Sequence, residues 1–194
     1  MTCIHSQFMT KKPNEFSGLS RRAFVVGCLG MIAGAGAQSA ELGNPYSLVY
    51  LRRGADQGWV NLDTDAGYES FRWLLRDVKT GTVGYPPRFL GYILSWMQTF
   101  FRVWGHDLPV EITSGLRLLS TNAHTEGAAR NSLHIPDQNG YFRAVDVKIP
   151  GIPGEYTGRL AALAQRGGVG FYGDQGHTHI DIGTVRYWRK LPKS

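Results

Sequence analysis

Polar and apolar residues alternate along "GHTHIDIG", residues 176–183, near the end of the chain. This period-two pattern predicts a strand, because successive side chains of a strand point to opposite faces. His177, His179 and Asp181 then share one face, with neighbours about 7 Å apart. The other face is formed by Thr178, Ile180 and Ile182. The segment is either a half-buried strand with incidental histidines or one side of a ligand site.

A second alternating stretch, "RAVDVKI" at residues 143–149, also predicts a strand. Its apolar face holds Val145, Val147 and Ile149. Asp146 lies on the other face, between Ala144 and Lys148. A carboxylate in mid-strand, flanked by valines, is unusual unless it is paired or ligating. The alternative to a ligand is an ion pair with a lysine or an arginine.

The length of the chain, 194 residues, is typical of one domain. Sequence patterns outside these two stretches predict further strands and helices. Strands are predicted within residues 46–62, 110–117, 142–151 and 168–183, the first and last of these forming hairpins. Helices are predicted at residues 66–81, 87–105 and 155–168, and residues 118–131 form a loop with one helical turn. Glycines end two of these helices, at Gly81 and at Gly167 and Gly168. This order predicts an α+β domain with a mainly antiparallel sheet.

The second predicted helix is apolar enough to raise the question of a membrane span. Its apolar run covers only residues 89–101 and is flanked by Arg88 and Arg102. A span needs about 20 residues. A helix buried in the core is therefore favoured.

The first 40 residues differ in kind from the rest. Arg21 and Arg22 precede an apolar, glycine-rich run that ends in small residues, within "SRRAFVVGCLGMIAGAGAQSA". A charged segment, a short apolar segment and an A-x-A site together predict a signal peptide at residues 1–40, cleaved near residues 37–40. Residues 41–194 would then form the mature domain.

The paired arginines resemble the twin-arginine export signal, which predicts delivery to the periplasm or cell envelope. Two alternatives concern the same segment: an uncleaved membrane anchor, and a lipoprotein attached at Cys28.

Cysteine usage and charge narrow the chemistry of the mature chain. Cys3 and Cys28 both lie in the leader, so the mature chain forms no disulfide and offers no thiolate ligand. Any metal site must therefore use His, Asp and Glu. The net charge of +6 falls to +3 once residues 1–37 are removed, which leaves 17 basic and 14 acidic residues. That bias gives no argument for nucleic acid as a partner and is compatible with an anionic polymer such as the cell wall.

A candidate ligand set combines the two alternating strands with one loop residue. His134, in "NSLH", precedes the strand that contains Asp146. With His179 it completes a set of two imidazoles and one carboxylate. Such a set leaves Zn²⁺ an open position for water, which becomes acidic enough to supply hydroxide near neutral pH. His177, on the same strand face as His179, would then serve that water instead of the metal.

Six motifs occur in order along the mature chain: "ITSGLRLLSTNA", "NSLH", "RAVDVKIPG", "GGVGFY", "HIDIG" and "VRYW". Together they resemble the D-Ala-D-Ala metallopeptidase family, the M15-type zinc peptidases, in the branch of murein endopeptidase K. The resemblance covers residues 46–188. The wider superfamily includes D-Ala-D-Ala dipeptidases and the Hedgehog signalling domain. The resemblance implies an enzyme that uses Zn²⁺ to cut peptides of peptidoglycan.

The resemblance also implies roles at matching positions. The zinc ligands are matched by His134, Asp146 and His179. Arg117 matches an arginine over the active site, where it could stabilise the oxyanion that forms when hydroxide attacks an amide carbonyl. The alternative for Arg117 is a surface ion pair. Ser114 and Ser132 match serines near the site, with structural roles.

The chain departs from the family pattern between its first two ligands. The family usually spaces these ligands as His-x6-Asp, whereas "IPDQNGYFRAV" separates His134 from Asp146. Turn residues occur in this segment at Pro136, Asp137, Asn139 and Gly140. The extra residues could therefore bulge out without moving either ligand. They could equally mark a drifted or inactive site.

A second departure is the histidine two residues before the last ligand, a position that is often not histidine in this branch. We expect His179 to bind the metal and His177 to lie beside it and handle the proton of the bound water. We expect Asp181 to orient a neighbour or an imidazole. Asp174 competes with His177 for the role of base, because a carboxylate is more usual there in related peptidases.

The sequence therefore predicts an exported zinc peptidase that cuts amide bonds in peptidoglycan cross-links, specifically those to diaminopimelate. Two other functions stay open: a non-catalytic zinc or cell-wall binding module with a degenerate site, and a D,D-dipeptidase or carboxypeptidase. His124, in the loop "NAHTEG", is not expected to be a ligand. No stable membrane span is expected in the mature form, and the sequence does not indicate an oligomeric state.

Overall fold

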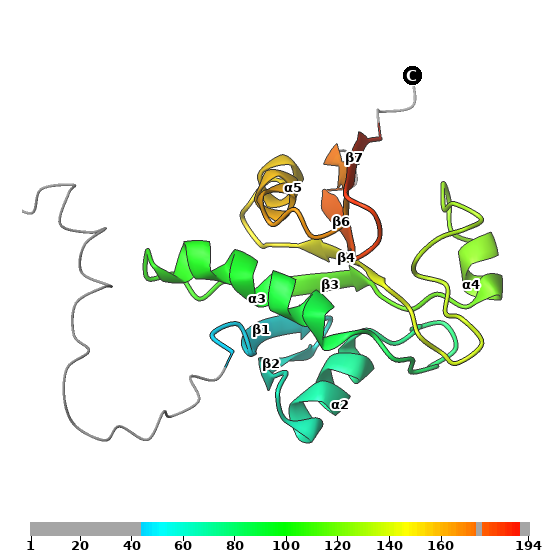
Figure 1. The fold of residues 1–194 in the computed structure, drawn as a ribbon, viewed down its shortest axis with the longest axis horizontal. Helices are drawn as coiled ribbons and strands as arrows, with labels where there is room; N and C mark the ends of the chain where they lie inside the picture. The colour runs from blue at the N-terminus through cyan, green and yellow to red at the C-terminus, as the bar shows by residue number, and fades with distance from the viewer. Residues whose placement is uncertain (1–43, 174–175, 191–194) are drawn as a thin grey trace, which may run out of the picture. The chain divides into compact units, whose positions relative to one another are not determined.

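One seven-stranded sheet organises the chain, with the strand order β2-β1-β3-β4-β6-β5-β7 (Figure 1). The computed structural model describes residues 44–173 and 176–190. The predicted signal peptide and the candidate base Asp174 lie outside the described residues. The strands are β1 (Leu48–Arg53), β2 (Asp56–Asn61), β3 (Val110–Ser114), β4 (Ala144–Lys148), β5 (Gly168–Tyr172), β6 (His177–Asp181) and β7 (Arg186–Arg189).

The sheet is mixed, so the expected α+β class is confirmed but the expectation of a mainly antiparallel sheet is wrong. β1 pairs with β3, and β5 with β7, in parallel. The other four pairings, β1–β2, β3–β4, β4–β6 and β5–β6, are antiparallel. Two helices connect β2 to β3, and a crossover of that length allows β3 to return beside β1 in the same direction. β7, which the sequence did not predict, pairs with the far edge of β5.

The helices are α2 (Asp65–Leu74), α3 (Arg88–Arg102), α4 (Leu119–Ala123) and α5 (Gly154–Leu163). Two of them end before the predicted glycines. α2 stops because Asp77 N–H donates to the Thr82 carbonyl and Gly81 N–H donates to the Asp77 carbonyl, which closes a turn. After α5, Gln165 takes the left-handed conformation, with φ 50°, that glycine was expected to supply.

The core lies on one face of the sheet. The strands bury Val49, Leu51, Val110, Ile112, Val145, Val147, Val169 and Ile180. The helices cover them with Phe71, Leu74, Leu90, Ile93, Leu94, Met97 and Ala161. Thr178 is also buried on this face and donates to the Gly154 carbonyl of α5 at 3.0 Å. The two faces predicted for β4 and β6 are therefore confirmed, and the polar face is left for a site.

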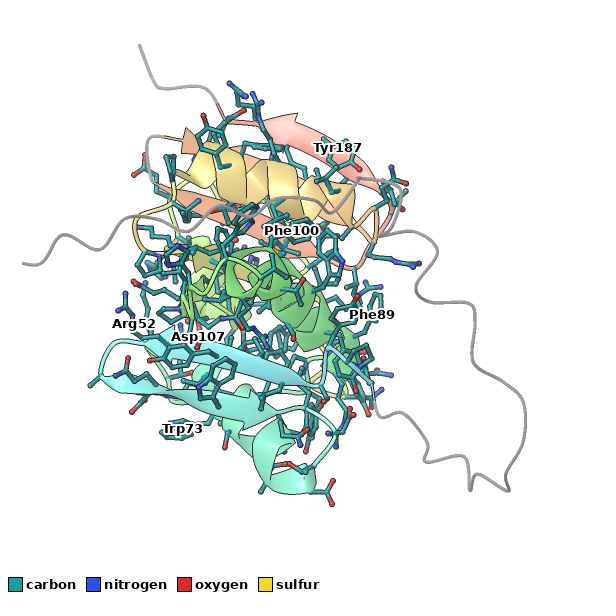
Figure 2. The ribbon with its side chains drawn as sticks, turned by 90° about the vertical axis from the view of Figure 1, so that its left-hand side faces the viewer. Arg52, Trp73, Phe89, Phe100, Asp107 and Tyr187 are labelled. Carbon is teal, nitrogen blue, oxygen red and sulfur yellow. The ribbon has the colours of Figure 1, made fainter. Side chains whose placement is uncertain are left out.

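α3 is the predicted core helix. Its residues Leu90, Ile93, Leu94 and Met97 are buried, while Phe89 and Phe100 reach the surface (Figure 2). Within the described residues, no helix combines the length and apolar character needed to cross a membrane.

Candidate metal centre

The candidate ligands meet on the face of the sheet opposite the core. β4 and β6 pair with Asp146 directly opposite His179, so both side chains project from the same face. Ser114 of β3 lies beside Asp146 on the other side. His134 comes from the loop before β4, and its carbonyl accepts a hydrogen bond from the Arg117 N–H at 3.0 Å. Two neighbouring strands and one loop thus supply the three side chains.

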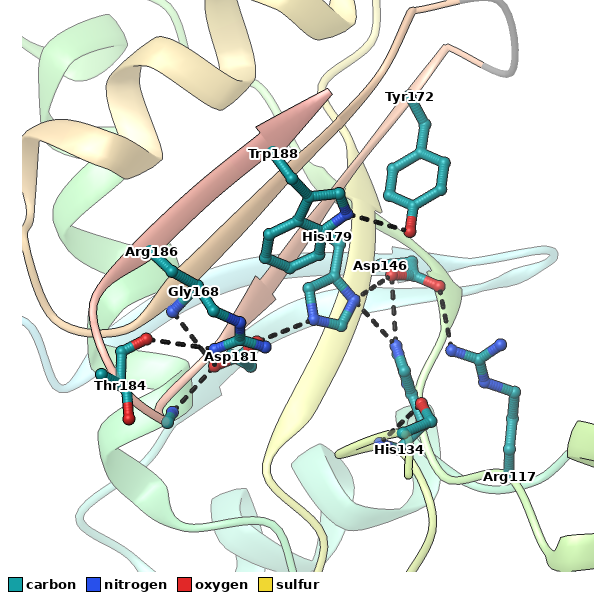
Figure 3. Close-up of polar contacts among 12 residues, drawn as sticks. Arg117, His134, Asp146, Gly168, Tyr172, His179, Asp181, Thr184, Arg186 and Trp188 are labelled. Atoms are coloured by element: carbon teal, nitrogen blue, oxygen red, sulfur yellow. Dashed lines mark hydrogen bonds and ion pairs between the residues drawn. The ribbon is translucent and has the colours of Figure 1, made fainter. Parts of the chain in front are cut away.

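The three side chains converge on one point (Figure 3). Asp146 Oδ1 lies 2.9 Å from His179 Nδ1 and 3.2 Å from His134 Nε2, and the two nitrogens are 3.1 Å apart. Ligand atoms about 2.0–2.1 Å from a tetrahedral metal ion lie about 3.3 Å from one another. All three residues are buried, and among the described residues they form the one group of His, Asp or Glu side chains that could hold a metal ion.

In each histidine, the ring nitrogen that faces away from this point makes a hydrogen bond, which leaves the lone pair of the other nitrogen directed towards the point. His134 Nδ1 lies 2.6 Å from the Gly115 carbonyl oxygen, which assigns the proton to Nδ1 and leaves Nε2 as an acceptor. His179 Nε2 lies 3.0 Å from Asp181 Oδ2, which assigns the proton to Nε2 and leaves Nδ1 able to ligate. With the Asp146 carboxylate, three acceptor atoms face one another, and a cation between them satisfies all three.

The electrostatics of the ligands agree with this arrangement. Burial alone would raise the pKa of Asp146, but His134 and His179 hold it well below its usual range. Burial lowers the pKa of His134 more than Asp146 raises it. Burial also acts to lower the pKa of His179, but hydrogen bonds to Asp146 and Asp181 raise it above its ordinary value. The site therefore favours positive charge at the His179 ring, which a proton or a metal ion can supply.

Asp181 is fixed by more than its contact with His179. It accepts backbone N–H bonds from Gly168 at 3.0 Å and from Gly183 at 2.8 Å. The Arg186 guanidinium reaches both of its carboxylate oxygens, at 3.1 and 2.7 Å. Burial would raise the pKa of Asp181, but His179, Arg186 and the two N–H groups lower it, so the group is ionised. This geometry agrees with the expected role of Asp181 in orienting an imidazole.

Arg117 shares a cavity of about 540 Å³ with the metal centre. Its Nη2 lies 3.7 Å from Asp146 Oδ2, and 11% of its side chain is exposed. Burial lowers the pKa of Arg117, while Asp146 acts to raise it, and a guanidinium stays charged under either influence. The alternative of a surface ion pair does not fit this burial. The charge of Arg117 is available inside the cavity.

His177 also lines this cavity, beside Asp146 and His179. Its ring stacks on Tyr172 with centroids 4.6 Å apart and planes 17° apart. Burial lowers the pKa of His177. The structure therefore brings His177 next to the metal centre, whereas the competing base Asp174 lies outside the described residues.

Sequence reasoning missed two aromatic residues of the site. The Trp188 ring of β7 lies 5.2 Å from the His179 ring, and its Nε1 donates to the Tyr172 hydroxyl at 3.4 Å. A Cβ added at Gly170, which pairs with both His179 and Trp188, would lie 2.6 Å from the Trp188 ring. The glycine thus lets the indole lie over β5. The alternation in "GVGFY", which puts Gly170 and Tyr172 on one face, was the available signal.

A buried carboxylate at the end of α2 supports the loop that carries Arg117. Asp77 is 1% exposed, and its Oδ2 accepts the Leu118 N–H at 2.9 Å. On the other side of Arg117, the Leu116 N–H donates to the Leu75 carbonyl at 2.7 Å. The residues before and after Arg117 are therefore both tied to the end of α2. No sequence pattern indicated this role of Asp77.

The long segment between His134 and Asp146 folds into a turn that packs against Tyr85. Asp137 closes it, because its Oδ1 accepts the N–H groups of Asn139 at 2.8 Å and of Tyr141 at 3.0 Å. The Tyr141 ring then packs against Tyr85 with centroids 5.6 Å apart. The ligand atoms converge despite the insertion, as the first of the two interpretations expected.

Three further residues that the sequence analysis singled out are Ser132, Ser114 and His124. The Ser132 hydroxyl accepts the His134 N–H at 3.3 Å, which fits a structural role. Ser114 lies next to Asp146 in the sheet register. His124 is exposed, and its Nδ1 lies 2.8 Å from the Ser120 carbonyl oxygen.

A family model described as Peptidase M15 matches residues 68–181, a range that includes all three candidate ligands and Arg117. The chain belongs to the Peptidase M15 family. This result confirms the resemblance carried by the ordered motifs, and the candidate metal centre described above lies within the matched part of this M15 chain.

Two curated relatives are similar over part of their length. The "Probable peptidoglycan L,D-endopeptidase MepK" of Haemophilus influenzae is 36% identical over 125 residues, which cover 60% of this M15 chain and 61% of the relative. The "Peptidoglycan L,D-endopeptidase MepK" of Escherichia coli K12 is 36% identical over 88 residues, 43% of this chain and 46% of the relative. The chain thus spans about half to three fifths of the relatives it matches. No solved structure matches it.

Proposed function

We propose that this chain is an exported zinc peptidase that hydrolyses amide bonds in the peptide cross-links of peptidoglycan, specifically those to diaminopimelate. The observation that carries the proposal is the convergence of His134 Nε2, Asp146 Oδ1 and His179 Nδ1 within 3.2 Å of one another, in a cavity that Arg117 also lines. The names of the two relatives, a "Probable peptidoglycan L,D-endopeptidase" and a "Peptidoglycan L,D-endopeptidase", support the substrate class.

Zn²⁺ is the metal that suits this donor set. Two imidazoles and one carboxylate, without a thiolate, match catalytic zinc sites that keep one position open. When bound, the ion would supply a Lewis acid and an activated water. His134 donates a hydrogen bond to the Gly115 carbonyl, and His179 donates one to Asp181. These bonds give each ring the tautomer that metal ligation requires.

Two side chains are assigned to the reaction itself. Arg117, a charged side chain that is 11% exposed, would donate hydrogen bonds to the amide oxygen as negative charge develops on it. His177 would take a proton from the attacking water and pass it to the leaving amine. Asp174 is the alternative base. The His177 ring is held at the cavity by its stack on Tyr172, which supports its assignment.

The proposal includes export to the periplasm by the twin-arginine route, with residues 1–40 as signal peptide and residues 41–194 as the peptidase domain. It rests on the arginine pair and the apolar run that follows it. These features lie outside the described residues, so the sequence alone supports them.

Digestion of purified sacculi tests the function. The zinc-loaded protein is expected to convert cross-linked muropeptides into monomers, identified by mass spectrometry, while the His179→Ala variant leaves them intact. Binding to sacculi with no loss of cross-links would support the non-catalytic module instead. Release of single D-amino acids or of a dipeptide would support the carboxypeptidase or dipeptidase alternative.

A further inference from the structure

The cavity that holds the metal centre is lined by an excess of basic side chains. Arg117, Arg186, Arg189 and Lys190 line it, against the acidic residues Glu126 and Asp146. Arg186 and Arg189 each form a hydrogen-bonded ion pair with a carboxylate, whereas Arg117 only approaches one and keeps its charge in the cavity. Arg186 pairs with Asp181 at 2.7 Å, Arg189 with Glu155 at 2.6 Å, and Arg117 lies 3.7 Å from Asp146.

Lys190 is held differently from these arginines. Its backbone N–H donates to the Phe171 carbonyl at 2.9 Å, which fixes the end of β7 beside β5. Its ammonium lies 5.6 Å from the centroid of the Tyr172 ring. Within residues 44–173 and 176–190, no carboxylate forms an ion pair with it, whereas Arg186 and Arg189 of the preceding strand each have one.

Gly127, which also lines the cavity, leaves space for the Lys190 ammonium. Gly127 has φ 69°, and a Cβ added there would lie 2.2 Å from Lys190 Nζ. Only glycine both adopts this conformation readily and leaves the ammonium its place. The Lys190 side chain therefore spans from the end of β7 to the loop at Gly127, with its charge at the cavity that Arg117 and His179 also line.

We propose that Lys190 binds a free carboxylate of the substrate next to the scissile amide. The inference rests on the proposed peptidase function and adds a specificity-determining residue to it. In a cross-link made through one amine of diaminopimelate, the carbon attached to the scissile nitrogen still carries a carboxylate. An ammonium in the cavity is a charge-assisted partner for that group.

This role predicts a particular kinetic signature. The carboxylate does not change its charge during hydrolysis, so its contact with Lys190 is equally strong before and in the transition state. Such uniform binding lowers KM and leaves kcat unchanged. The contact is also partly exposed to solvent, so its effect should weaken as ionic strength rises.

The test compares two cross-linked muropeptide dimers, one with the diaminopimelate carboxylates free and one with them amidated. The zinc-loaded wild type should show a KM about tenfold lower for the free dimer, the ratio that one charge-assisted contact gives. Lys190→Met should raise the KM of the free dimer to that of the amidated one, with kcat within about twofold. Lys190→Arg, which keeps the charge, should retain most of the preference.

Lys79→Met, which removes an exposed lysine from the turn after α2, is the matched control and should behave as wild type. If Lys190→Met cleaves both dimers with the wild-type ratio of KM values, the carboxylate site is wrong and the peptidase function stands. If the zinc-loaded wild type cleaves neither dimer, the proposed function itself fails, and the site at Lys190 fails with it.

Discussion

The two histidines of the His-x-His pair share a strand face but differ in what lies behind each ring. His179 is enclosed by carboxylates, with Asp146 Oδ1 at 2.9 Å from Nδ1 and Asp181 Oδ2 at 3.0 Å from Nε2. His177 instead stacks its ring on Tyr172. The His179 ring, which has a partner on each nitrogen, is oriented as a metal ligand needs to be. The His177 ring is held through stacking of its face, which leaves its nitrogens free to exchange a proton. Substitutions of His179 and of His177 should therefore have different effects on metal binding and on activity.

Alanine substitutions separate these roles. His179→Ala should lose zinc and activity together, because a carboxylate and one imidazole hold Zn²⁺ far less well than three ligands. His177→Ala should keep about one zinc per chain and lose activity by about 100- to 10,000-fold, the usual effect of removing a positioned acid or base. Zinc content and kcat/KM on a cross-linked muropeptide measure the two effects.

His124→Ala is the control for both variants, since His124 is an exposed histidine outside the metal group. A fully active His177→Ala enzyme would transfer the proton-handling role to Asp174. Loss of zinc from the same variant would mean that His177 is itself a ligand.

At the scale of elements, the end of α2 and the loop after β3 act as one unit. Asp77 accepts the Leu118 N–H, and the Leu75 carbonyl accepts the Leu116 N–H, so the loop cannot shift without breaking both bonds. Asp77→Asn removes the charge and weakens its hydrogen bonds. We expect the free energy of unfolding to fall by about 2 kcal/mol at pH 7, measured by urea unfolding.

The pH dependence of that difference identifies its cause. Burial would raise the pKa of Asp77, but hydrogen bonds from Thr121 and from the N–H groups of Leu118, Lys79 and Thr80 lower it below the ordinary 3.8. A carboxylate with a lowered folded-state pKa stabilises the fold above its unfolded-state pKa, and this stabilisation is lost as the pH falls through the folded value. The difference between wild type and Asp77→Asn should therefore be constant from pH 5 to pH 8 and shrink below pH 3.8. A difference that is the same at pH 3 and pH 7 would assign the effect to shape rather than charge.

The insertion between the first two ligands gives a second test at this scale. Asp137→Ala removes the acceptor for two N–H groups of the turn and should lower the free energy of unfolding by about 1 kcal/mol. Zinc content should stay at the wild-type level, because the turn packs against Tyr85 and supplies none of the candidate ligand atoms. Metal analysis beside thermal unfolding measures both. A variant that lost its zinc would show that the insertion holds the ligands in place.

The sequence predicted those elements whose side chains alternate or repeat, and it missed those defined by tertiary contacts. The alternation around Asp146 and around His179 correctly predicted which side chains of β4 and β6 face away from the core. β7 has only four residues and no alternation, so the strand was not predicted. Trp188 belongs to the motif "VRYW" but was not identified as a residue of the site. The end of α2 was placed too late, because the bonds that draw Asp77 into a turn come partly from Leu118, 41 residues further along the chain.

At the scale of the whole molecule, local sequence patterns could not predict the order of the strands in the sheet. Each local hairpin was predicted, but the parallel pairings β1–β3 and β5–β7 depend on which edges meet after the helices have packed. The family assignment succeeded because it used ordered motifs rather than local structure. The destination of the protein is a third property at this scale, and we propose that residues 1–40 determine it.

Replacement of Arg21 and Arg22 by lysines should leave the protein in the cytoplasm. Lysines keep both positive charges, so any export that needs only a charged segment before an apolar run should continue. The twin-arginine signal is instead read by a receptor, and the substitution removes the guanidinium groups without changing the charge. Cell fractionation with an antibody against the mature chain measures the distribution, and an exported protein with a general secretion signal is the control. A double-lysine variant that reaches the periplasm at the wild-type rate would assign this chain to the general secretion route.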